Sequence, residues 1–354
     1  MTRRIYLDHA ASTPILPQAA AAIREACDHW ANPSSAHAEG RAVRAAMEEA
    51  RRRIGAALGW DGALVFTSGA TEAIEIVMRR AKAGPRIVSS IEHPAVLRAA
   101  PDARRIEALP DGTLDLADLD AALAGAERPL VAVQSVNNET GVIHPIETIA
   151  ARVKAVDGLL LVDCAQSAGK LPLPQADFIS IAAHKLGGPP GIGALLLRDP
   201  ASLEAVGGQE GGQRPGTAAV PMIMGFAAAC EADHGWYEEA ERLRDLLDGA
   251  IVEAGGEVVS AAAPRIATIA GYRMPGVPAA AQMMQMDLAG IAVSAGSACS
   301  SGSLKASHVL AAMGLPEEEA REVIRVSFGP QTRASDIEAL LAEWRRLIAR
   351  RRAA

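Results

Sequence analysis

A run of small and hydroxyl-bearing residues, Thr67-Ser68-Gly69-Ala70-Thr71-Glu72, follows a predicted strand and opens a predicted helix. Small residues let backbone amides approach an anion, and the positive end of a helix dipole favours negative charge. The segment therefore predicts a phosphate-binding turn. A simple strand-to-helix turn with Thr71 as the helix cap is the alternative that this segment alone leaves open.

A second candidate, Asp163, follows the apolar run Leu159–Val162, and Gln166 comes three residues later. Ligands of open α/β sheets bind beyond the carboxyl ends of the strands, so both side chains are placed to face one. A carboxylate at this position could stay ionised against a cationic ring nitrogen. Read alone, Asp163 fits equally well as the cap of a following helix.

A third candidate is Lys185, one of only five lysines among the 35 basic residues. It follows His184 and the apolar run Phe178–Ala182, and a stretch rich in Gly and Pro comes after it. A lysine that is partly desolvated becomes neutral more readily and can form a Schiff base with an aldehyde. A solvated surface lysine is the alternative.

Together the three candidates supply what pyridoxal 5'-phosphate requires. The cofactor needs a phosphate grip, a carboxylate for its pyridinium nitrogen and a lysine for its aldehyde. The segment Thr67–Glu72, then Asp163, then Lys185 provide these groups in one order along the chain. The sequence therefore predicts a pyridoxal-phosphate site.

The four cysteines are widely separated and form no CxxC pair and no Cys/His spacing typical of zinc. We therefore expect no metal site and no disulfide scaffold. Cys299 stands out because it lies among small residues, in Ser294–Gly302, where a thiolate could move between a substrate and an acceptor. Cys164 and Cys230 have apolar surroundings and are expected to be inert.

The composition of the 354 residues excludes several classes of protein. A charged fraction of 22% and a hydrophobic fraction of 49% are typical of a folded globular chain rather than a disordered one. The net charge of −7 argues against nucleic acid held by bulk charge. No apolar run approaches the length of a membrane span, and we expect a cytoplasmic protein without a membrane anchor.

Alternating apolar runs and helical patterns between residues 63 and 198 are typical of an α/β fold with a mostly parallel sheet. The predicted strands are Ala63–Thr67, Arg86–Ser89, Leu130–Val136, Leu159–Val162, Phe178–Ala182 and Gly193–Leu197. The predicted helices are Gly40–Leu58, Glu72–Arg80, Leu116–Ala124 and Ile146–Val156.

The pattern changes beyond residue 200. A glycine-dense loop, Gly207–Gly216, precedes one helical segment, Ala218–Ala254. Shorter predicted strands then alternate with helices, and the last helix carries an apolar stripe from Ile337 to Ile348. These strands are Ile266–Ala270, Ile291–Val293 and Val323–Ser327. We predict a large cofactor domain of residues 12–235 and a smaller α+β domain of residues 1–11 and 236–354, which carries the Cys299 loop.

These motifs resemble those of the cysteine desulfurases, the NifS/IscS-like branch of the class V aminotransferases. The resemblance extends from Tyr6 to about Gly329 and implies a pyridoxal-phosphate-dependent enzyme of fold type I. The matching blocks are Tyr6–Pro14, Asn32–Ser35 with His37, Thr67–Glu72, Glu92-His93, Val136–Gly141, Val162–Gln166, His184-Lys185, Arg214–Thr217 and Ser294–Cys299.

The resemblance also implies a role for individual residues around the cofactor. Lys185 would hold the cofactor covalently and later carry a proton, and Asp163 would pair with the pyridinium nitrogen. His93 would stack on the ring and assist proton transfer, while Gln166 would hydrogen-bond the phenolic oxygen. Four residues would hold the phosphate: Ala70 through its backbone, Thr71, His184 and, from the partner subunit of a homodimer, Thr217.

For the substrate, the resemblance implies that Asn138 and Arg325 bind the carboxylate of L-cysteine, with Arg325 acting as a bidentate fork. Cys299 would attack the substrate sulfur, which leaves a persulfide on the enzyme and releases L-alanine. The sulfur would pass to an acceptor protein for iron–sulfur cluster assembly, or for thiolation of transfer RNA or cofactors. A selenocysteine lyase, or another class V aminotransferase, is the alternative activity, and a non-catalytic partner with the same fold is a further one.

Three positions depart from the family pattern. Ala182 stands where relatives carry a phosphate-binding Ser, Glu75 replaces a usual Asn, and Pro190 replaces a usual Lys. One neutral hydrogen bond contributes about 1 kcal/mol net, and a bond to a charged group contributes more. We therefore expect the Ala182 change to weaken cofactor binding without abolishing it.

Overall fold

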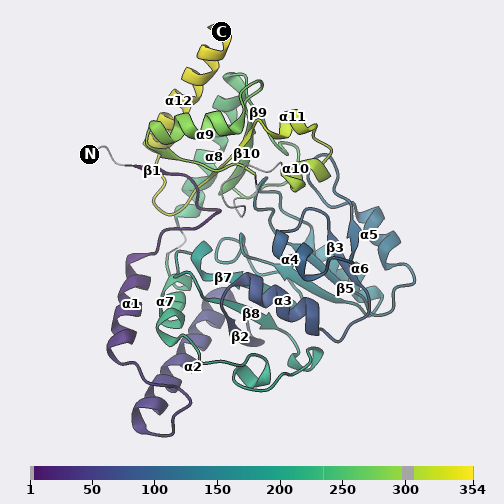
Figure 1. Cartoon of the computed structure of the whole chain (residues 1–354), viewed down its shortest axis with the longest axis vertical. Coiled ribbons are helices and arrows are strands. Elements are labelled where there is room, and N and C mark those ends of the chain that lie inside the picture. The colour runs from purple at the N-terminus through teal and green to yellow at the C-terminus, as the bar shows by residue number, and fades with distance from the viewer. Residues whose placement is uncertain (1–3, 234, 297–306, 354) are drawn as a thin grey trace.

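The computed structural model describes residues 4–233, 235–296 and 307–353. Figure 1 shows two bodies, one built around a large sheet with helices on both faces, the other around smaller sheets near the C-terminal helix. Cys299 and most of the segment around it lie outside the described residues. The division of the chain into domains at residue 235 stays a prediction.

The large sheet contains seven strands in the order β2-β8-β7-β6-β5-β3-β4. Strand β8 runs antiparallel to both of its neighbours, β2 and β7. The other neighbouring pairs, β3-β4, β3-β5, β5-β6 and β6-β7, are parallel. The predicted mostly parallel α/β sheet is therefore confirmed. The strands are β2 (Ala63–Thr67), β3 (Arg86–Ser89), β4 (Arg104–Ile106), β5 (Leu130–Gln134), β6 (Leu159–Asp163), β7 (Phe178–Ala182) and β8 (Gly193–Leu197).

Helices cover both faces of this sheet because successive strand residues point to opposite sides. Val65 packs on one face beneath α3 (Ala70–Arg80) and α4 (Pro94–Ala99). Its neighbour Phe66 packs on the other face. The helices of that second face are α2 (Ala38–Leu58), α5 (Leu116–Leu123), α6 (Ile146–Ala155) and α7 (Val220–Cys230), and α1 (Pro17–Asp28) packs against α7.

The second body contains a three-stranded antiparallel sheet in the order β12-β10-β9 and a parallel pair, β1-β11. Its core is built around the fully buried Tyr272 and Trp344. The strands are β1 (Ile5–Tyr6), β9 (Glu257–Val258), β10 (Ile269–Arg273), β11 (Ile291–Ala292) and β12 (Val323–Ser327). The helices are α8 (Trp236–Glu253), α9 (Ala279–Leu288), α10 (His308–Ala312), α11 (Glu317–Ala320) and α12 (Ala334–Ala353).

Several elements differ from the sequence prediction, and the strand predicted at Ile266–Ala270 is found at Ile269–Arg273. The single helical segment predicted for Ala218–Ala254 is wrong, because α7 ends at Cys230 and α8 begins at Trp236. Between them Asp233 accepts a hydrogen bond from the backbone amide of Gly235, so a short turn interrupts the helix. Strand β4 was not predicted, because its two arginines are exposed at the edge of the sheet and it has no apolar run.

Within the described residues, every helix is too short or too polar to cross a lipid bilayer.

Candidate active site

A cavity of about 440 Å³ lies beyond the carboxyl ends of strands of the large sheet, and Arg325 of β12 in the second body also lines it. The position agrees with the general rule for ligand sites in open α/β sheets. Nine residues expected to have functional roles line it: Ala70, Thr71, His93, Asn138, Asp163, Gln166, His184, Lys185 and Arg325.

One end of the cavity is formed by the turn between β2 and α3. Gly69 precedes the helix with φ of 154°, a conformation that favours glycine, and a side chain there would point into open space. A Cβ on Gly193 would lie 2.7 Å from the Cα of Gly69, so the two backbones pack closely. The helix begins at Ala70, and the first amides of a helix have no partner within it, which suits a phosphate group. Gly69 rather than Thr71 occupies the cap position, which provides no side-chain hydrogen bond to the helix.

Asp163 ends β6 and is buried at the floor of the cavity. Its Oδ1 accepts hydrogen bonds from Ser180 Oγ at 2.9 Å and from the backbone amide of Ala165 at 3.0 Å. Within the part of the chain that the structure describes, both of these bonds go to the same oxygen, so Oδ2 can face a cation in the cavity. Asp163 can therefore pair with a protonated ring nitrogen.

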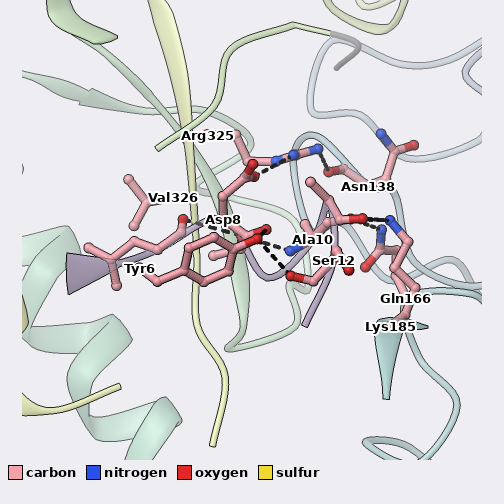
Figure 2. Close-up of polar contacts among 12 residues, drawn as sticks. Tyr6, Asp8, Ala10, Ser12, Asn138, Gln166, Lys185, Arg325 and Val326 are labelled. Carbon is pink, nitrogen blue, oxygen red and sulfur yellow. Dashed lines mark hydrogen bonds and ion pairs between the residues drawn. The ribbon is translucent and has the colours of Figure 1, made fainter. Parts of the chain in front are cut away.

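Lys185 ends the short 3-10 turn Ala183–Lys185 that follows β7. Its Nζ donates to the backbone carbonyls of Ala10 and Ala11, at 2.9 Å for Ala11. Gln166 Nε2 donates to the same Ala10 carbonyl at 3.0 Å, so the two side chains meet at one point, as Figure 2 shows. Among the described residues, no group bonds the buried Gln166 Oε1. A hydroxyl on a bound ring would satisfy it.

Two histidines of the cavity are held in the neutral form. Burial lowers the pKa of His93, and the charge of Lys185 lowers it further while Asp163 opposes the shift. His93 also caps α4, where its Nδ1 accepts from the amide of Ala95 at 3.2 Å. Burial, followed by the charge of Lys185, lowers the pKa of His184 to about 4. Both imidazoles are thus uncharged at neutral pH until an anion is bound beside them.

Arg325 is held in place from two sides. Its Nη2 forms an ion pair with Asp8 Oδ1 at 2.8 Å, and its Nη1 donates to the backbone carbonyl of Asn138 at 3.0 Å. The arginine side chain is only 5% exposed. Asn138 thus contacts Arg325 through its backbone carbonyl, and it is also one of the residues that line the cavity. Asp8 was not predicted, although it lies in the block Tyr6–Pro14.

A further residue that the sequence did not identify is Lys170. It is half-buried in a cavity of about 190 Å³ that Lys185 also lines, and its Nζ donates to the carbonyl of Gln166 at 3.0 Å. Burial, followed by the charge of Lys185, lowers the pKa of Lys170 to about 7. In the sequence it resembles any lysine after a turn, so only its packing distinguishes it.

The remaining candidates lie elsewhere or show no activation. Thr217 is exposed and does not line the cavity of its own chain. Cys27 is exposed on α1, and burial raises the pKa of Cys164 to about 12 and raises that of Cys230 as well, so both buried cysteines stay protonated thiols. The described residues contain no group of three or more His, Cys, Asp or Glu side chains that could hold a metal ion.

Two of the three departures noted in the sequence line the cavity, namely Ala182 and Pro190. Glu75 is instead exposed on α3.

The residues present fit pyridoxal 5'-phosphate. A helix start beside an open glycine suits the phosphate, a free carboxylate oxygen suits the ring nitrogen, and a lysine amine lies in the same cavity. The fold and this cavity define a pyridoxal-phosphate-dependent enzyme of fold type I.

Comparison with known proteins gives the family. Residues 5–340 match the aminotransferase class-V family. The chain is 35% identical to a cysteine desulfurase of Trichormus azollae, with 99% of this chain and 94% of the relative covered. It is also 35% identical to cysteine desulfurase IscS 1 of Archaeoglobus fulgidus, covering 95% of this chain and 94% of the relative.

Solved structures give the same result. An X-ray structure of a NifS-like protein from Rickettsia africae has a TM-score of 0.89 at 30% identity and covers 98% of this chain and 100% of its own. A structure described as SspA in complex with cysteine has a TM-score of 0.79 at 30% identity, with 92% and 99% covered. The chain belongs to the class-V aminotransferase family and, within it, to the cysteine desulfurases.

Proposed function

We propose that this protein converts L-cysteine to L-alanine and transfers the sulfur, as a persulfide on Cys299, to an acceptor protein. The observation that carries the proposal is that Lys185, Asp163 and Arg325 line one cavity, although they come from different parts of the chain. A covalent anchor, a partner for a ring nitrogen and a fork for a carboxylate are the groups that an amino-acid substrate of this cofactor requires.

The bound cofactor would act as an electron sink for the substrate carbon next to the carboxylate. Lys185 would hold the cofactor through Nζ, and its amine would carry the proton of this carbon. Asp163 would pair with the protonated ring nitrogen through Oδ2. His93 would stack on the ring and assist the transfer of protons. Gln166 and His184, with the amide of Ala70 and the hydroxyl of Thr71, would orient the ring and its phosphate.

Arg325 and Asn138, which line the same cavity, would hold the substrate carboxylate. With the substrate fixed in this way, the Cys299 thiolate attacks the substrate sulfur. An S–S bond forms as the C–S bond breaks, and the electron pair of the C–S bond stays with the substrate β-carbon. Protonation of this β-carbon and return of a proton to the α-carbon give alanine. Cys299 lies outside the described residues, so its part in the proposal rests on the sequence and on the similarity to cysteine desulfurases.

We further propose a homodimer, because Thr217 is exposed in its own chain yet belongs to the phosphate-binding set of the family. The acceptor would be a scaffold or sulfur-carrier protein of a pathway such as iron–sulfur cluster assembly. The proposed location is the cytoplasm. Sedimentation of the purified protein at a dimer mass tests the first of these points, and a monomer at micromolar concentration would contradict it.

The test of the main proposal is turnover of L-cysteine by purified protein with added thiol reductant, followed through both alanine and sulfide. Cys299→Ser should abolish sulfide release and leave the visible absorbance of the bound cofactor intact. Cys27→Ser is the matched control, because Cys27 is exposed on α1 outside the cavity, and it should keep full activity. Sulfide release by Cys299→Ser at the wild-type rate would exclude the proposed role of this residue.

A second variant and a substrate panel separate the alternatives. Lys185→Ala should lose the visible absorbance band, and a colourless wild type would instead favour a protein that has kept the fold without the chemistry. L-selenocysteine and L-alanine serve as competing substrates under the same conditions. Faster release of selenide than of sulfide, independent of Cys299, would favour a selenocysteine lyase.

A further inference from the structure

Asp8 is the carboxylate that neutralises Arg325, and the backbone fixes both residues. The chain around Asp8 lies alongside β12, the strand that carries Arg325. Ser327 donates its amide to the carbonyl of Leu7 at 2.8 Å, and its Oγ accepts from the amide of Ala10 at 2.8 Å. Asp8 is therefore anchored on both sides against the strand that presents the arginine.

The ion pair determines how the guanidinium is oriented. Arg325 is almost completely buried, so its charge needs a partner to offset the loss of hydration. Asp8 meets Nη2 and the carbonyl of Asn138 meets Nη1, as Figure 2 shows, so neither end can turn freely. Each of these nitrogens carries a second N–H. A bound carboxylate could accept from that pair while Asp8 stays in place.

The same segment also holds the lysine end of the cavity. The carbonyls of Ala10 and Ala11 accept from Lys185, and the Ala10 carbonyl accepts from Gln166 as well. One stretch of four residues, Asp8–Ala11, thus contacts both Arg325 and Lys185. This short segment therefore links the carboxylate fork to the lysine amine through contacts with both side chains.

We propose that Asp8 is a positioning residue for the substrate carboxylate, holding Arg325 in its receiving orientation before the substrate binds. The inference rests on the proposed role of Arg325 in binding the carboxylate. It assigns no chemistry to Asp8 itself, which acts through the arginine. An opposite arrangement, in which Asp8 competes with the substrate for the arginine, predicts the opposite change in affinity and is decided by the same experiment.

The experiment compares L-cysteine with 2-aminoethanethiol, which has the amine and the thiol but no carboxylate. In holoenzyme carrying Asp8→Asn, the ratio of kcat/KM for the two thiols should fall about tenfold, through a higher KM for L-cysteine. A general loss of structure would lower kcat/KM for both thiols by the same factor and would leave their ratio unchanged. Asp8→Glu keeps the charge and should lie closer to the wild-type ratio than Asp8→Asn does.

The control variant is Asp248→Asn. Asp248 forms a comparably buried ion pair with Arg265 at 2.6 Å but does not line the cavity. Asp248→Asn should leave the ratio of kcat/KM for the two thiols unchanged, because a loss of stability at a site outside the cavity affects both substrates alike.

Direct binding provides a readout that does not depend on turnover. Calorimetry of the holoenzyme with 3-mercaptopropionate, which has the carboxylate but no amine to form a Schiff base with the cofactor, should give about tenfold weaker binding for Asp8→Asn. Unchanged or tighter binding would overturn the proposal, and tighter binding would identify Asp8 as a competitor. If the wild type binds this compound but does not release sulfur from cysteine, the proposed function fails while Asp8 is still tested.

Discussion

Replacing Lys170 by Met should make the folding stability of this protein less dependent on pH between pH 6 and pH 9. The Lys170 ammonium lies against the Gln166 carbonyl in a small cavity that Lys185 shares. Burial and the neighbouring charge lower its pKa from the ordinary 10.5 to about 7. Met has similar length and no charge, so the substitution removes this electrostatic penalty and keeps most of the packing.

The direction of the effect follows from proton binding. Between pH 7 and pH 10.5 the unfolded chain binds a proton at Lys170 that the folded chain has released, so raising the pH stabilises the folded state of the wild type. Below pH 7 both states are protonated and the full penalty is present. With one pKa unit equal to about 1.4 kcal/mol, the wild type should gain about 2.5 kcal/mol relative to Lys170→Met between pH 6 and pH 9.

Urea unfolding at several pH values, followed by tryptophan fluorescence, measures this difference. Lys154→Met on the exposed surface of α6 is the control, because it makes the same chemical change at a solvated lysine. The free energy of unfolding of Lys154→Met should differ from that of the wild type by nearly the same amount at every pH. If the difference between Lys170→Met and the wild type is equally constant with pH, the folded chain does not disfavour the charged lysine and the reasoning is refuted.

Three further substitutions test other parts of the structure. Glu210→Gln should lower the free energy of unfolding by about 3 kcal/mol in urea titrations, because it removes the charge that faces the mostly buried Arg51. An unchanged free energy of unfolding would contradict a stabilising ion pair between these two residues. Gly329→Ala should lower the melting temperature, because a Cβ there would lie 2.0 Å from Nδ1 of the buried His9, whose ring would have to move. Asp163→Asn should weaken cofactor binding by about tenfold or more in titrations of the cofactor-free protein, and equal affinity would argue against pairing with the ring nitrogen.

The buried strands could be predicted closely from the sequence. The predicted bounds of β2, β3, β7, β8 and β12 agree with the structure, because a strand covered on both faces is apolar at most positions and gives a short, clearly bounded run. The same property made the polar residues after these strands conspicuous. Asp163 and Lys185 were found in this way, and they line one cavity because the carboxyl ends of neighbouring parallel strands meet at one edge of the sheet.

Elements with mixed composition could not be predicted as well. Strand β4 has two exposed arginines at the sheet edge, and the turn between α7 and α8 interrupts a pattern that is helical on both sides. In both cases the position within the folded chain determines the local structure, and the local sequence carries too little of that information.

By itself the sequence indicated an α/β fold and a pyridoxal-phosphate site at Thr67–Glu72, Asp163 and Lys185, because these depend on composition and short spacing. The other expected site residues came from the resemblance of its motifs to those of the cysteine desulfurases. The tertiary structure alone decided that Asp8 pairs with Arg325 across 317 residues, and that Lys170 lies in the same small cavity as Lys185. Neither relation follows from local pattern, since the partner of a charge and the water removed from around it are set by which distant segments pack together.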